Sequence, residues 1–451
     1  MSMPARITAI HGSPAEAAKK APAVASSDLL IAWNGEHANV SARTEAICVP
    51  ADDPLPDAAE DLLDIAVALY AADIAVMRGE RERWTREIDL AVPVRLIDLW
   101  NDAAEDLRRL TYELTRDTVR LTFYESHEAP PRECAAANAP GFEPDCVCML
   151  SGGLDSLAGA VMLHETGRRP IWSLHRSGNP AVRTAQERAL AALDDHWPGR
   201  GSARPGTVEP NSRGEAALPY PAPEKREPSR RCRSFLFMAL ALATAEAVGV
   251  DDVYMPENGV LTAGLPLVAS RAGSNSTHST HPSALKLMNE IAKRAGLRGR
   301  LCNPFVYQTK SELIRDILAP NLSVSEIQNT ASCWAVGRAN RQCGGCIPCL
   351  LRQIGMAWAE LPSEAYMLEP LARPSDYVGT DAYGNVVDML RQAERASRLS
   401  EAEMLVAHPE LLSLHSAGLD VDGVAAMFRR HAEQTLTVVR DRYTEAARLL
   451  R

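Results

Sequence analysis

The sequence lacks a long apolar run and the start of a secreted protein. No stretch reaches the ~20 consecutive apolar residues that a membrane-spanning helix needs, and the longest candidate, residues 235–250, is interrupted by Thr244 and Glu246. The first 25 residues are rich in Ala and Pro and lack the apolar segment of a secretory signal. We therefore expect a cytoplasmic protein with no membrane partner.

Basic and aromatic residues are also in short supply. The chain has 48 Lys and Arg against 58 Asp and Glu, a net charge of −10, and only 5% of its residues are aromatic. A field of that sign argues against a general nucleic-acid binder, and scarce aromatics argue against stacking platforms for single strands. Nucleic acid is therefore not an expected partner.

What is present is a globular composition at a length that suggests about three domains. Hydrophobic residues make up 46% and charged residues 24% of the 451 residues, as in ordinary soluble domains. From shifts in composition and periodicity we expect these units: a flexible N-terminus (1–27), an N-terminal α/β domain (28–125), a linker (126–144), a central domain (145–352) and a C-terminal helical region (353–451).

The central part alternates between short apolar runs and helical patterns. Apolar runs at 146–150 and 171–174 are each followed by helical periodicity, at 157–163 and 184–196. This is the pattern of βαβ units, so we expect an α/β fold with a central parallel twisted sheet. The polar, proline-rich segment 198–230 is expected to be a mobile loop.

A glycine-rich hexapeptide, Ser-Gly-Gly-Leu-Asp-Ser at 151–156, lies between an expected strand and an expected helix. Adjacent glycines let the backbone approach a ligand, and the amides at a helix N-terminus form a nest for an anion. Asp155 would repel a phosphate on its own, so we expect it to bind Mg²⁺ or to fix the conformation of the loop. The alternative is an ordinary strand-to-helix turn with Asp and Ser as caps.

Four cysteines fall within seventeen residues, with the spacing Cys-x9-Cys-x2-Cys-x2-Cys: Cys333, Cys343, Cys346 and Cys349. Four thiolates complete a tetrahedral Zn²⁺ shell, and a full shell favours a structural metal over a catalytic one. An iron–sulfur cluster, a redox dithiol and unrelated buried thiols remain alternatives, since the number of thiolates does not separate them.

The hexapeptide resembles the PP-loop of the N-type ATP pyrophosphatases, or adenine-nucleotide α-hydrolases (HUP-like fold). Together with the cysteine motif and the Leu-Leu-Arg that follows it at 350–352, it resembles QueC, the 7-cyano-7-deazaguanine synthase family. Arg233-Ser234 resembles the Arg-Asn segment of that family, with Ser in place of Asn. Residues 303–312 resemble its Pro-Leu…Thr-Lys-x-Glu stretch. The resemblance covers about residues 146–352.

The QueC resemblance implies ATP, Mg²⁺ and Zn²⁺ as cofactors and adenylation of the carboxylate of 7-carboxy-7-deazaguanine, followed by attack of ammonia. It implies catalytic roles for Asp155, Lys310 and Arg233. The residues that it implies for ATP binding are Ser151, Gly152, Gly153, Leu154, Asp155, Ser156 and His175. Three of these residues also have a simpler interpretation. Lys310 is then a solvated surface lysine, Arg233 is part of a solvated arginine cluster, and His175 is a structural residue at the end of a strand.

Glu257 and Asn258 follow an expected strand at 253–255. They therefore lie at the carboxyl end of a strand, where open α/β sheets bind ligands. A carboxylate and an amide suit the hydrogen-bonding edge of a guanine-like substrate. The alternative for this pair is a plain turn.

The regions outside the central domain, with residues 256–260 and 280–282, resemble QatC, the QueC-like component of the four-gene Qat antiphage system. This second resemblance implies a protein partner from the same defence operon, with a protein amine as an alternative nucleophile. Other interpretations are a housekeeping 7-cyano-7-deazaguanine synthase, a tRNA-modifying PP-loop thiolase and a nucleotide-binding scaffold without turnover. The acidic charge balance weighs against the thiolase.

Overall fold

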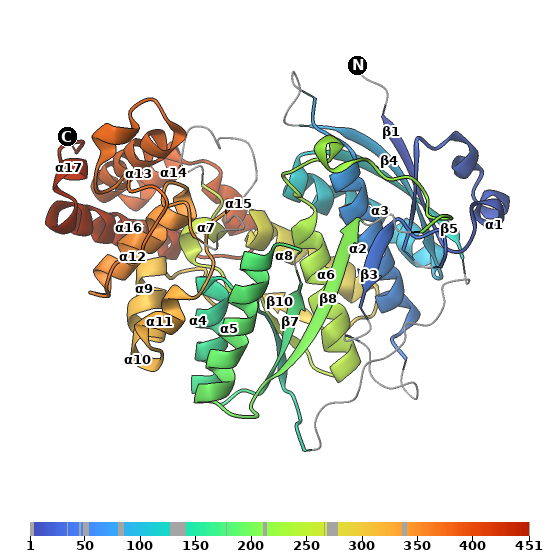
Figure 1. The fold of residues 1–451 in the computed structure, drawn as a ribbon, viewed down its shortest axis with the longest axis horizontal. Helices are drawn as coiled ribbons and strands as arrows, with labels where there is room; N and C mark the ends of the chain where they lie inside the picture. Colours follow the sequence, from blue (N-terminus) through green and yellow to red (C-terminus); the bar gives the residue numbers. More distant parts are fainter. Residues whose placement is uncertain are drawn as a thin grey trace.

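The computed structural model describes residues 4–33, 35–44, 47, 54–79, 85–126, 141–176, 178–210, 214–265, 267, 278–335 and 341–450. An N-terminal sheet with helices, a central sheet with helices and a C-terminal group of helices follow one another along the chain (Figure 1). Within the described ranges, no helix combines the length and the apolarity that crossing a membrane requires.

The N-terminal unit is a parallel four-stranded sheet with the order β2-β1-β4-β5. Its strands are β1 (Ala5–Ile10), β2 (Leu29–Ala32), β4 (Glu87–Val94) and β5 (Thr118–Glu125), with helices α2 (Asp57–Ala75) and α3 (Ile97–Thr115). Both helices bury apolar residues against the common core. This unit was expected as an α/β domain.

The expectation of a flexible segment at 1–27 is wrong for its described residues. β1 pairs with β2 on one side and with β4 on the other, and α1 (Pro14–Lys20) begins with a capping box between Ser13 and Glu16. The Ala- and Pro-rich composition hides a strand whose burial comes from its two neighbours in the sheet, which composition does not report.

The central sheet has six strands in the order β10-β9-β6-β7-β8-β3. They are β3 (Val40–Arg43), β6 (Cys146–Met149), β7 (Pro170–His175), β8 (Ser202–Pro210), β9 (Asp252–Tyr254) and β10 (Arg300–Cys302). All pairs are parallel except β3 with β8. This confirms the predicted parallel sheet and shows that residues 28–125 contribute an edge strand to it.

β8 corrects the expectation of a mobile loop over 198–230. The strand pairs in parallel with β7 and antiparallel with β3, and Val208 is fully buried. Pro205 within the strand, Pro210 at its end and polar alternate residues gave the segment the composition of a loop. Residues 211–213 lie outside the described residues, as does most of the expected linker at 126–144.

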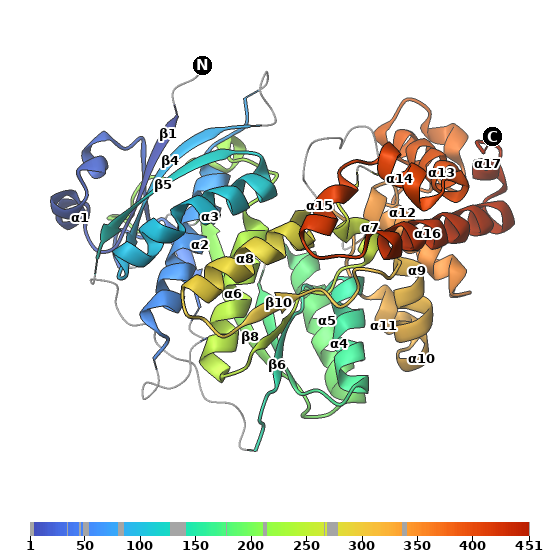
Figure 2. The same ribbon diagram turned by 180° about the vertical axis from the view of Figure 1, so that it is seen from behind.

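Helices α4 (Leu154–Glu165), α5 (Pro180–His196), α6 (Arg233–Val248) and α8 (Pro282–Arg294) surround the central sheet (Figure 2). β6 pairs with β7 on one side and with β9 on the other. The connections leaving β6 and β9 therefore diverge at a topological switch point, where open α/β sheets form their ligand crevice.

The chain after the central sheet is helical, as expected for the C-terminal region. Its elements include α9 (Lys310–Glu312), α12 (Ile347–Trp358), α13 (Asp381–Arg398), α14 (Glu401–Ala407), α15 (Leu411–Ser416) and α16 (Val421–Arg442). α12 runs across the boundary expected at residue 352. α16 is the long helix drawn in red in both ribbon views (Figures 1 and 2), and its apolar side joins the core of this region.

Candidate active site

The hexapeptide forms a loop between β6 and α4. Hydrogen bonds of its two serine hydroxyl groups stabilise this loop. The Ser151 and Ser156 hydroxyls lie 3.1 Å apart, and the Gly153 amide donates to Ser151 Oγ over 3.3 Å. Ser156 Oγ donates to the Gly153 carbonyl over 2.9 Å, and Gly153 is the N-cap of α4. The predicted PP-loop residues thus surround the N-terminus of a helix, where free amides attract an anion.

Gly152 is needed for the path of this loop. Its φ is +80°, and a Cβ atom at this position would lie 2.8 Å from the backbone nitrogen of Gln186 in α5. Its carbonyl accepts from the Ala331 amide over 2.9 Å. Backbone from two other segments therefore presses on the loop, and only glycine combines this φ with this contact.

Asp155 lies in the first turn of α4 and contacts two other predicted residues. Its Oδ2 accepts from Lys310 Nζ over 3.0 Å and from Asn258 Nδ2 over 2.9 Å. Its Oδ1 is buried and has no hydrogen-bond partner among the described residues. A buried carboxylate oxygen without a donor is costly, so the position fits a cation or another donor.

Lys310 is the first residue of α9, as predicted, and only 4% of it is exposed. This burial excludes the alternative of a solvated surface lysine. Its ammonium group has Asp155 as the acidic partner, which compensates for a cation placed at a helix N-terminus.

Glu257 follows β9 and accepts from the Thr280 hydroxyl. Burial raises the pKa of Glu257 to about 7; the nearby Asp155 adds to this rise, while Thr280 and Lys310 oppose it. Asn303 fixes the backbone here by donating to the Glu257 carbonyl over 2.8 Å and accepting from its amide over 3.2 Å. The carboxyl group is therefore placed beside the Asp155–Lys310 pair and titrates near neutrality.

Asn258 is fully buried and is the N-cap of α7 (Gly259–Thr262). Its Oδ1 accepts from the Leu261 amide over 3.3 Å, and its Nδ2 donates to Asp155. The side chain therefore already fixes α7 and Asp155, and its predicted contact with substrate stays a prediction.

His175 and Arg233 form a second group near the N-terminal unit. His175 ends β7, its Nε2 lies 3.3 Å from the Val208 amide, and its ring packs on Tyr70 of α2 and Phe237. Burial lowers the pKa of His175 to about 4, so the ring is neutral at physiological pH. The Arg233 guanidinium lies 5.7 Å from the centre of the Phe237 ring.

One hydrogen bond connects this second group with the Glu257 side. Ser234, the neighbour of Arg233 in α6, lies 2.7 Å from Ser279 through their hydroxyls, and Thr280 follows directly. Among the described residues, no hydrogen bond or ion pair joins Arg233 or His175 to Asp155. Sequence reasoning did not single out Tyr70, because nothing near it in the chain differs from an ordinary core helix.

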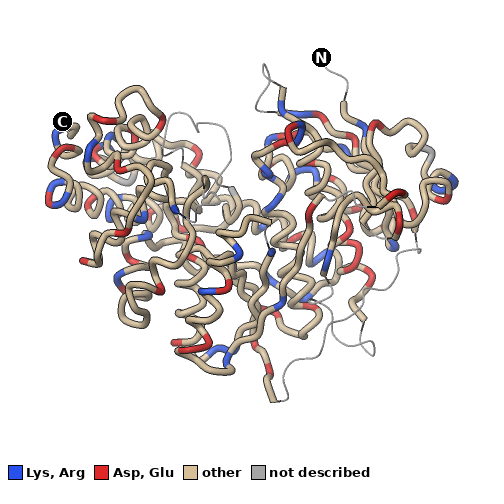
Figure 3. Tube along the Cα trace, in the orientation of Figure 1, with Lys and Arg blue, Asp and Glu red and all other residues tan. Residues whose placement is uncertain are grey.

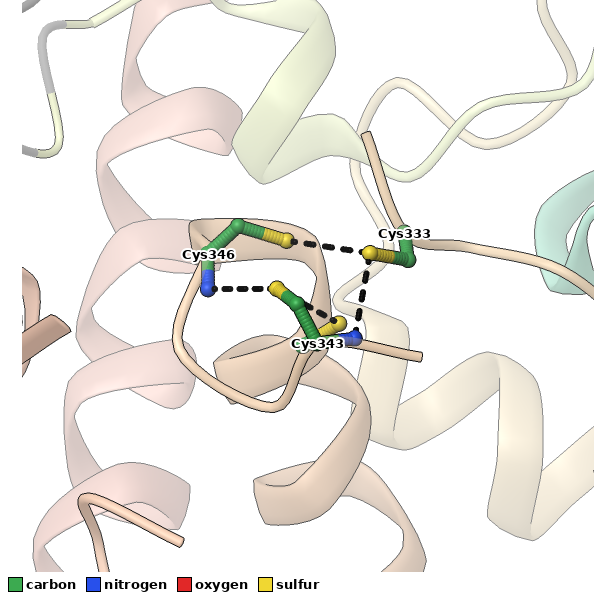
Figure 4. Close-up of side chains that lie close together, drawn as sticks. Cys333, Cys343 and Cys346 are labelled. Atoms are coloured by element: carbon green, nitrogen blue, oxygen red, sulfur yellow. Dashed lines mark hydrogen bonds between the residues drawn. The ribbon is translucent and has the colours of Figure 1, made fainter. Parts of the chain in front are cut away.

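The four cysteines come together at the start of α12, which includes Cys349; Figure 4 shows the other three, Cys333, Cys343 and Cys346. All four sulfur atoms lie within 4.8 Å of one another, and the Sγ atoms are 3.9 Å apart in the pairs Cys343–Cys349 and Cys333–Cys346. A tetrahedral shell with Zn–S bonds of about 2.3 Å places sulfurs about 3.8 Å apart. The cluster is thus able to hold a zinc ion.

The cysteine cluster is linked to the PP-loop through the segment that precedes Cys333. Ala331 donates to the Gly152 carbonyl. Arg352, the arginine of the Leu-Leu-Arg motif, is fully buried; it donates to Thr330 Oγ1 over 2.6 Å and to the Ile327 carbonyl over 2.9 Å. The cysteine cluster and Arg352 therefore support one side of the PP-loop.

Acidic and basic residues are interspersed along the whole trace rather than gathered at one end (Figure 3). The electrostatics of the crevice are therefore set by its local groups, of which Asp155 and Lys310 are a directly paired example. No one-sided field of the whole molecule is needed to explain them.

Comparison with known proteins identifies the central part. Residues 229–360 match the family described as "Queuosine biosynthesis protein QueC". The chain is 30% identical over 231 residues to the 7-cyano-7-deazaguanine synthase of Thermoplasma acidophilum, covering 48% of this chain and 90% of that protein. The chain belongs to the QueC family. The synthase of Myxococcus xanthus is 29% identical over 232 residues, 48% of this chain and 94% of its own length.

The QueC match covers much of the candidate site and leaves about half the chain outside it. Residues 229–360 include Arg233, Glu257, Lys310 and the four cysteines. The relatives are matched over nearly their full length. About half of this chain lies outside each of these matches, and the family match at 229–360 includes neither α2 nor α16.

Proposed function

We propose that this QueC-family chain uses ATP to adenylate the carboxylate of a 7-deazaguanine, 7-carboxy-7-deazaguanine, for attack by a nitrogen nucleophile. The observation that carries this proposal is the Asp155 carboxylate at the start of α4. One of its oxygens is bound by Lys310 and Asn258, and the other is buried with no partner among the described residues. Synthases of 7-cyano-7-deazaguanine among the relatives support the substrate class.

In the proposed reaction, an oxygen of the substrate carboxylate attacks the α-phosphorus of ATP. The bond from that phosphorus to the bridging oxygen breaks, and pyrophosphate leaves. The nitrogen nucleophile then attacks the acyl carbon and AMP departs, with the proton of the nitrogen going to solvent or a nearby base. The amides around Gly153 and the α4 N-terminus suit the pyrophosphate, and the Lys310 ammonium stabilises the charge that develops on it.

Asp155 fits a magnesium ion because its free oxygen is a hard, anionic donor. When bound, Mg²⁺ neutralises charge on the phosphates. Arg233 suits a phosphate or a carboxylate, since guanidinium forms paired hydrogen bonds with both. The cysteine cluster is proposed as a structural zinc site, because all four positions of a tetrahedral shell are taken by protein.

Glu257 is proposed to recognise the guanine-like edge. An ionised carboxylate accepts from the ring N–H and the exocyclic amine, and its position after β9 places it at the carboxyl end of the sheet. Because its pKa is raised to about 7, we expect substrate binding to strengthen as the pH rises through neutrality.

For the biological role we propose antiphage defence of the QatC type, with a partner protein encoded in the same operon. The support is the additional half of the chain that the synthases do not match. Ammonia or an amine of the partner is then the acceptor, and the product of this step is an amide. With ammonia, a second ATP activates the amide oxygen with loss of pyrophosphate, and departure of that oxygen with AMP and loss of the nitrogen-bound protons give the nitrile. Housekeeping 7-cyano-7-deazaguanine synthesis is the second candidate, favoured by the relatives themselves.

The test is incubation with ATP, Mg²⁺, 7-carboxy-7-deazaguanine and ammonia, followed by mass spectrometry. AMP and pyrophosphate that form in the wild type and not in Asp155→Asn support the enzyme. A nitrile product with ammonia alone supports the housekeeping role. A mass gain on a co-encoded protein supports the defence role. Absence of AMP with every carboxylate and partner overturns the enzyme and leaves a nucleotide-binding scaffold.

A further inference from the structure

The C-terminal helix α16 packs along the segment that leads to Lys310. The Asp420 amide donates to the Tyr307 hydroxyl over 2.9 Å, and Arg430 Nη2 donates to the Tyr307 carbonyl over 2.7 Å. Gly423 permits this approach, since a Cβ atom there would lie 3.0 Å from the Tyr307 ring. α16 thus contacts both the side chain and the backbone of a residue three positions before Lys310.

α16 also holds both residues of the capping box that begins α9. The Thr309 amide donates to Glu312 Oε2 over 2.9 Å, and the Glu312 amide donates to Thr309 Oγ1 over 3.2 Å. The Thr309 hydroxyl then donates to Gln434 Oε1 over 2.8 Å. Glu312 Oε1 accepts from Arg430 Nε over 2.7 Å and from Gln434 Nε2 over 3.3 Å. Lys310 lies between two residues that are each tied to α16.

The second residue that binds Asp155 rests on the same segment. Asn258 donates to Asp155 Oδ2, and the amide of the next residue, Gly259, donates to the Gln308 carbonyl over 2.7 Å. Met427 of α16 packs here, with its methyl group 3.1 Å from the position of a Cβ at Gly259. Both donors to Asp155 Oδ2 are therefore attached to backbone that α16 supports.

This support matters because the local conformation does not by itself stabilise a buried lysine at a helix N-terminus. The helix dipole disfavours a cation there, and fixing a lysine side chain in one conformation costs rotamer entropy. The backbone must therefore be fixed for Nζ to stay 3.0 Å from Asp155. Misplacement of a catalytic group by about 1 Å costs on the order of 100-fold in rate.

We infer that Arg430 and Gln434 are positioning residues for Lys310, supplied by a region outside the QueC family match at 229–360. The C-terminal helix α16 is then part of the structure that positions the residues of the candidate active site. The effect on reaction rate rests on the proposed function, whereas the effect on Lys310 itself does not.

The experiment compares Arg430→Met, Gln434→Met and the double variant with the wild type in the full chain. Arg440→Met is the matched control, an exposed arginine of the same helix. Modification of Lys310 by an amine-reactive acylating reagent is followed by peptide mass spectrometry, with Lys293 as internal standard. We expect Lys310, now 4% exposed, to be modified at least about 5-fold faster in the double variant and unchanged in the control.

With ATP and 7-carboxy-7-deazaguanine, we expect kcat for AMP formation to fall about 10- to 100-fold. KM for ATP should stay within about 3-fold, because Lys310 acts on charge that develops in the transition state. Arg430→Lys should recover part of the rate, since it keeps a cation beside Glu312. A general loss of structure gives neither this split nor this recovery.

Unchanged Lys310 modification in the double variant overturns the inference, whatever the activity. AMP formation absent from the wild type overturns the proposed function alone, because the modification rate still reports on Lys310. If Arg430→Met loses its cooperative thermal transition, Gln434→Met carries the test by itself with the same two outcomes.

Discussion

The cysteine cluster and the Asp155 site differ in how many of their polar atoms have a partner within the protein. The cysteine cluster is a closed set: four like ligands face one another, and its glycines are packed so tightly that a Cβ at Gly344 would lie 2.0 Å from the Leu368 carbonyl oxygen. The Asp155 site is a mixed set, with one carboxylate oxygen bound twice and the other unbound among the described residues.

This difference indicates what each part does. A closed thiolate shell leaves a metal no position for a substrate, so its contribution is to hold the chain together. A buried acceptor without a donor is retained where a ligand supplies what the protein does not. The Ala331–Gly152 hydrogen bond joins the two parts, so the closed cluster is placed to keep the open site in shape.

The largest expected effect comes from opening the closed cluster. Cys346→Ser removes one ligand, and we expect the metal content to fall from about one zinc per chain to below about 0.2. The free energy of unfolding should fall by several kcal/mol, since binding of a structural zinc contributes on the order of 10 kcal/mol to folding. Elemental analysis and urea unfolding measure the two effects.

Cys302→Ser is the matched control, because Cys302 lies outside the cluster in β10. It should keep both the metal and the stability of the wild type. A Cys346→Ser protein that keeps its zinc and its stability contradicts a closed structural shell. Iron in place of zinc in the wild type contradicts the choice of metal.

The open site should respond in the opposite manner, with a large loss of activity and a small loss of stability. Asp155→Asn removes the negative charge beside Lys310, and we expect AMP formation to fall at least about 100-fold. The unfolding free energy should fall by only about 1–3 kcal/mol, the usual cost of a buried group losing its partner. Pyrophosphate release and urea unfolding measure these values.

Asp316→Asn, an exposed aspartate paired with Arg315, is the control for this change and should match the wild type in both assays. If Asp155→Asn keeps activity within about threefold, the unbound oxygen has no role in the reaction. The open site is then only a buried ion pair.

Glu257 provides a pH test of the open site. Its pKa is raised from an ordinary value near 4.5 to about 7, so folding favours the protonated form. The stability from this group is fully present below about pH 4.5 and is lost as the pH rises through about 7. Between pH 5 and 8, we expect the wild type to lose about 2 kcal/mol more unfolding free energy than Glu257→Gln.

The exposed Glu224 gives the control: Glu224→Gln should follow the wild-type pH curve. Parallel curves for Glu257→Gln and the wild type between pH 5 and 8 show that Glu257 does not titrate near 7. The proposed strengthening of substrate binding through neutral pH is then removed as well.

Features that depend on residues close together in the chain could be predicted from the sequence. Local spacing determines the glycine-rich loop and the cysteine cluster, because their residues lie close together in the chain and chemistry restricts the spacing. The parallel sheet follows from the alternation of short apolar runs with helical periodicity. These features were predicted, and the structure confirms the sheet and the cysteine cluster.

Long-range contacts were not predictable in the same way. Asn258 and Lys310 lie 103 and 155 positions after Asp155, and their meeting depends on the order of strands in the sheet. Their candidacy came from the family resemblance and from the ends of strands. Gln434 contacts Thr309 across 125 positions and carries no local signal. β1 and β8 were missed because their burial is decided by neighbouring strands.

The smallest expected effect concerns whether Arg233 belongs to the open site. Ser234 and Ser279 connect α6 to the Thr280–Glu257 side through one hydrogen bond of 2.7 Å. Ser234→Ala should lower the unfolding free energy by about 1 kcal/mol and leave AMP formation within about threefold. In a double-mutant cycle with Ser279→Ala, we expect a coupling energy of about 0.5–1 kcal/mol. Additive effects contradict the connection and separate Arg233 from the Glu257 side, because among the described residues this is the side-chain hydrogen bond that links the two.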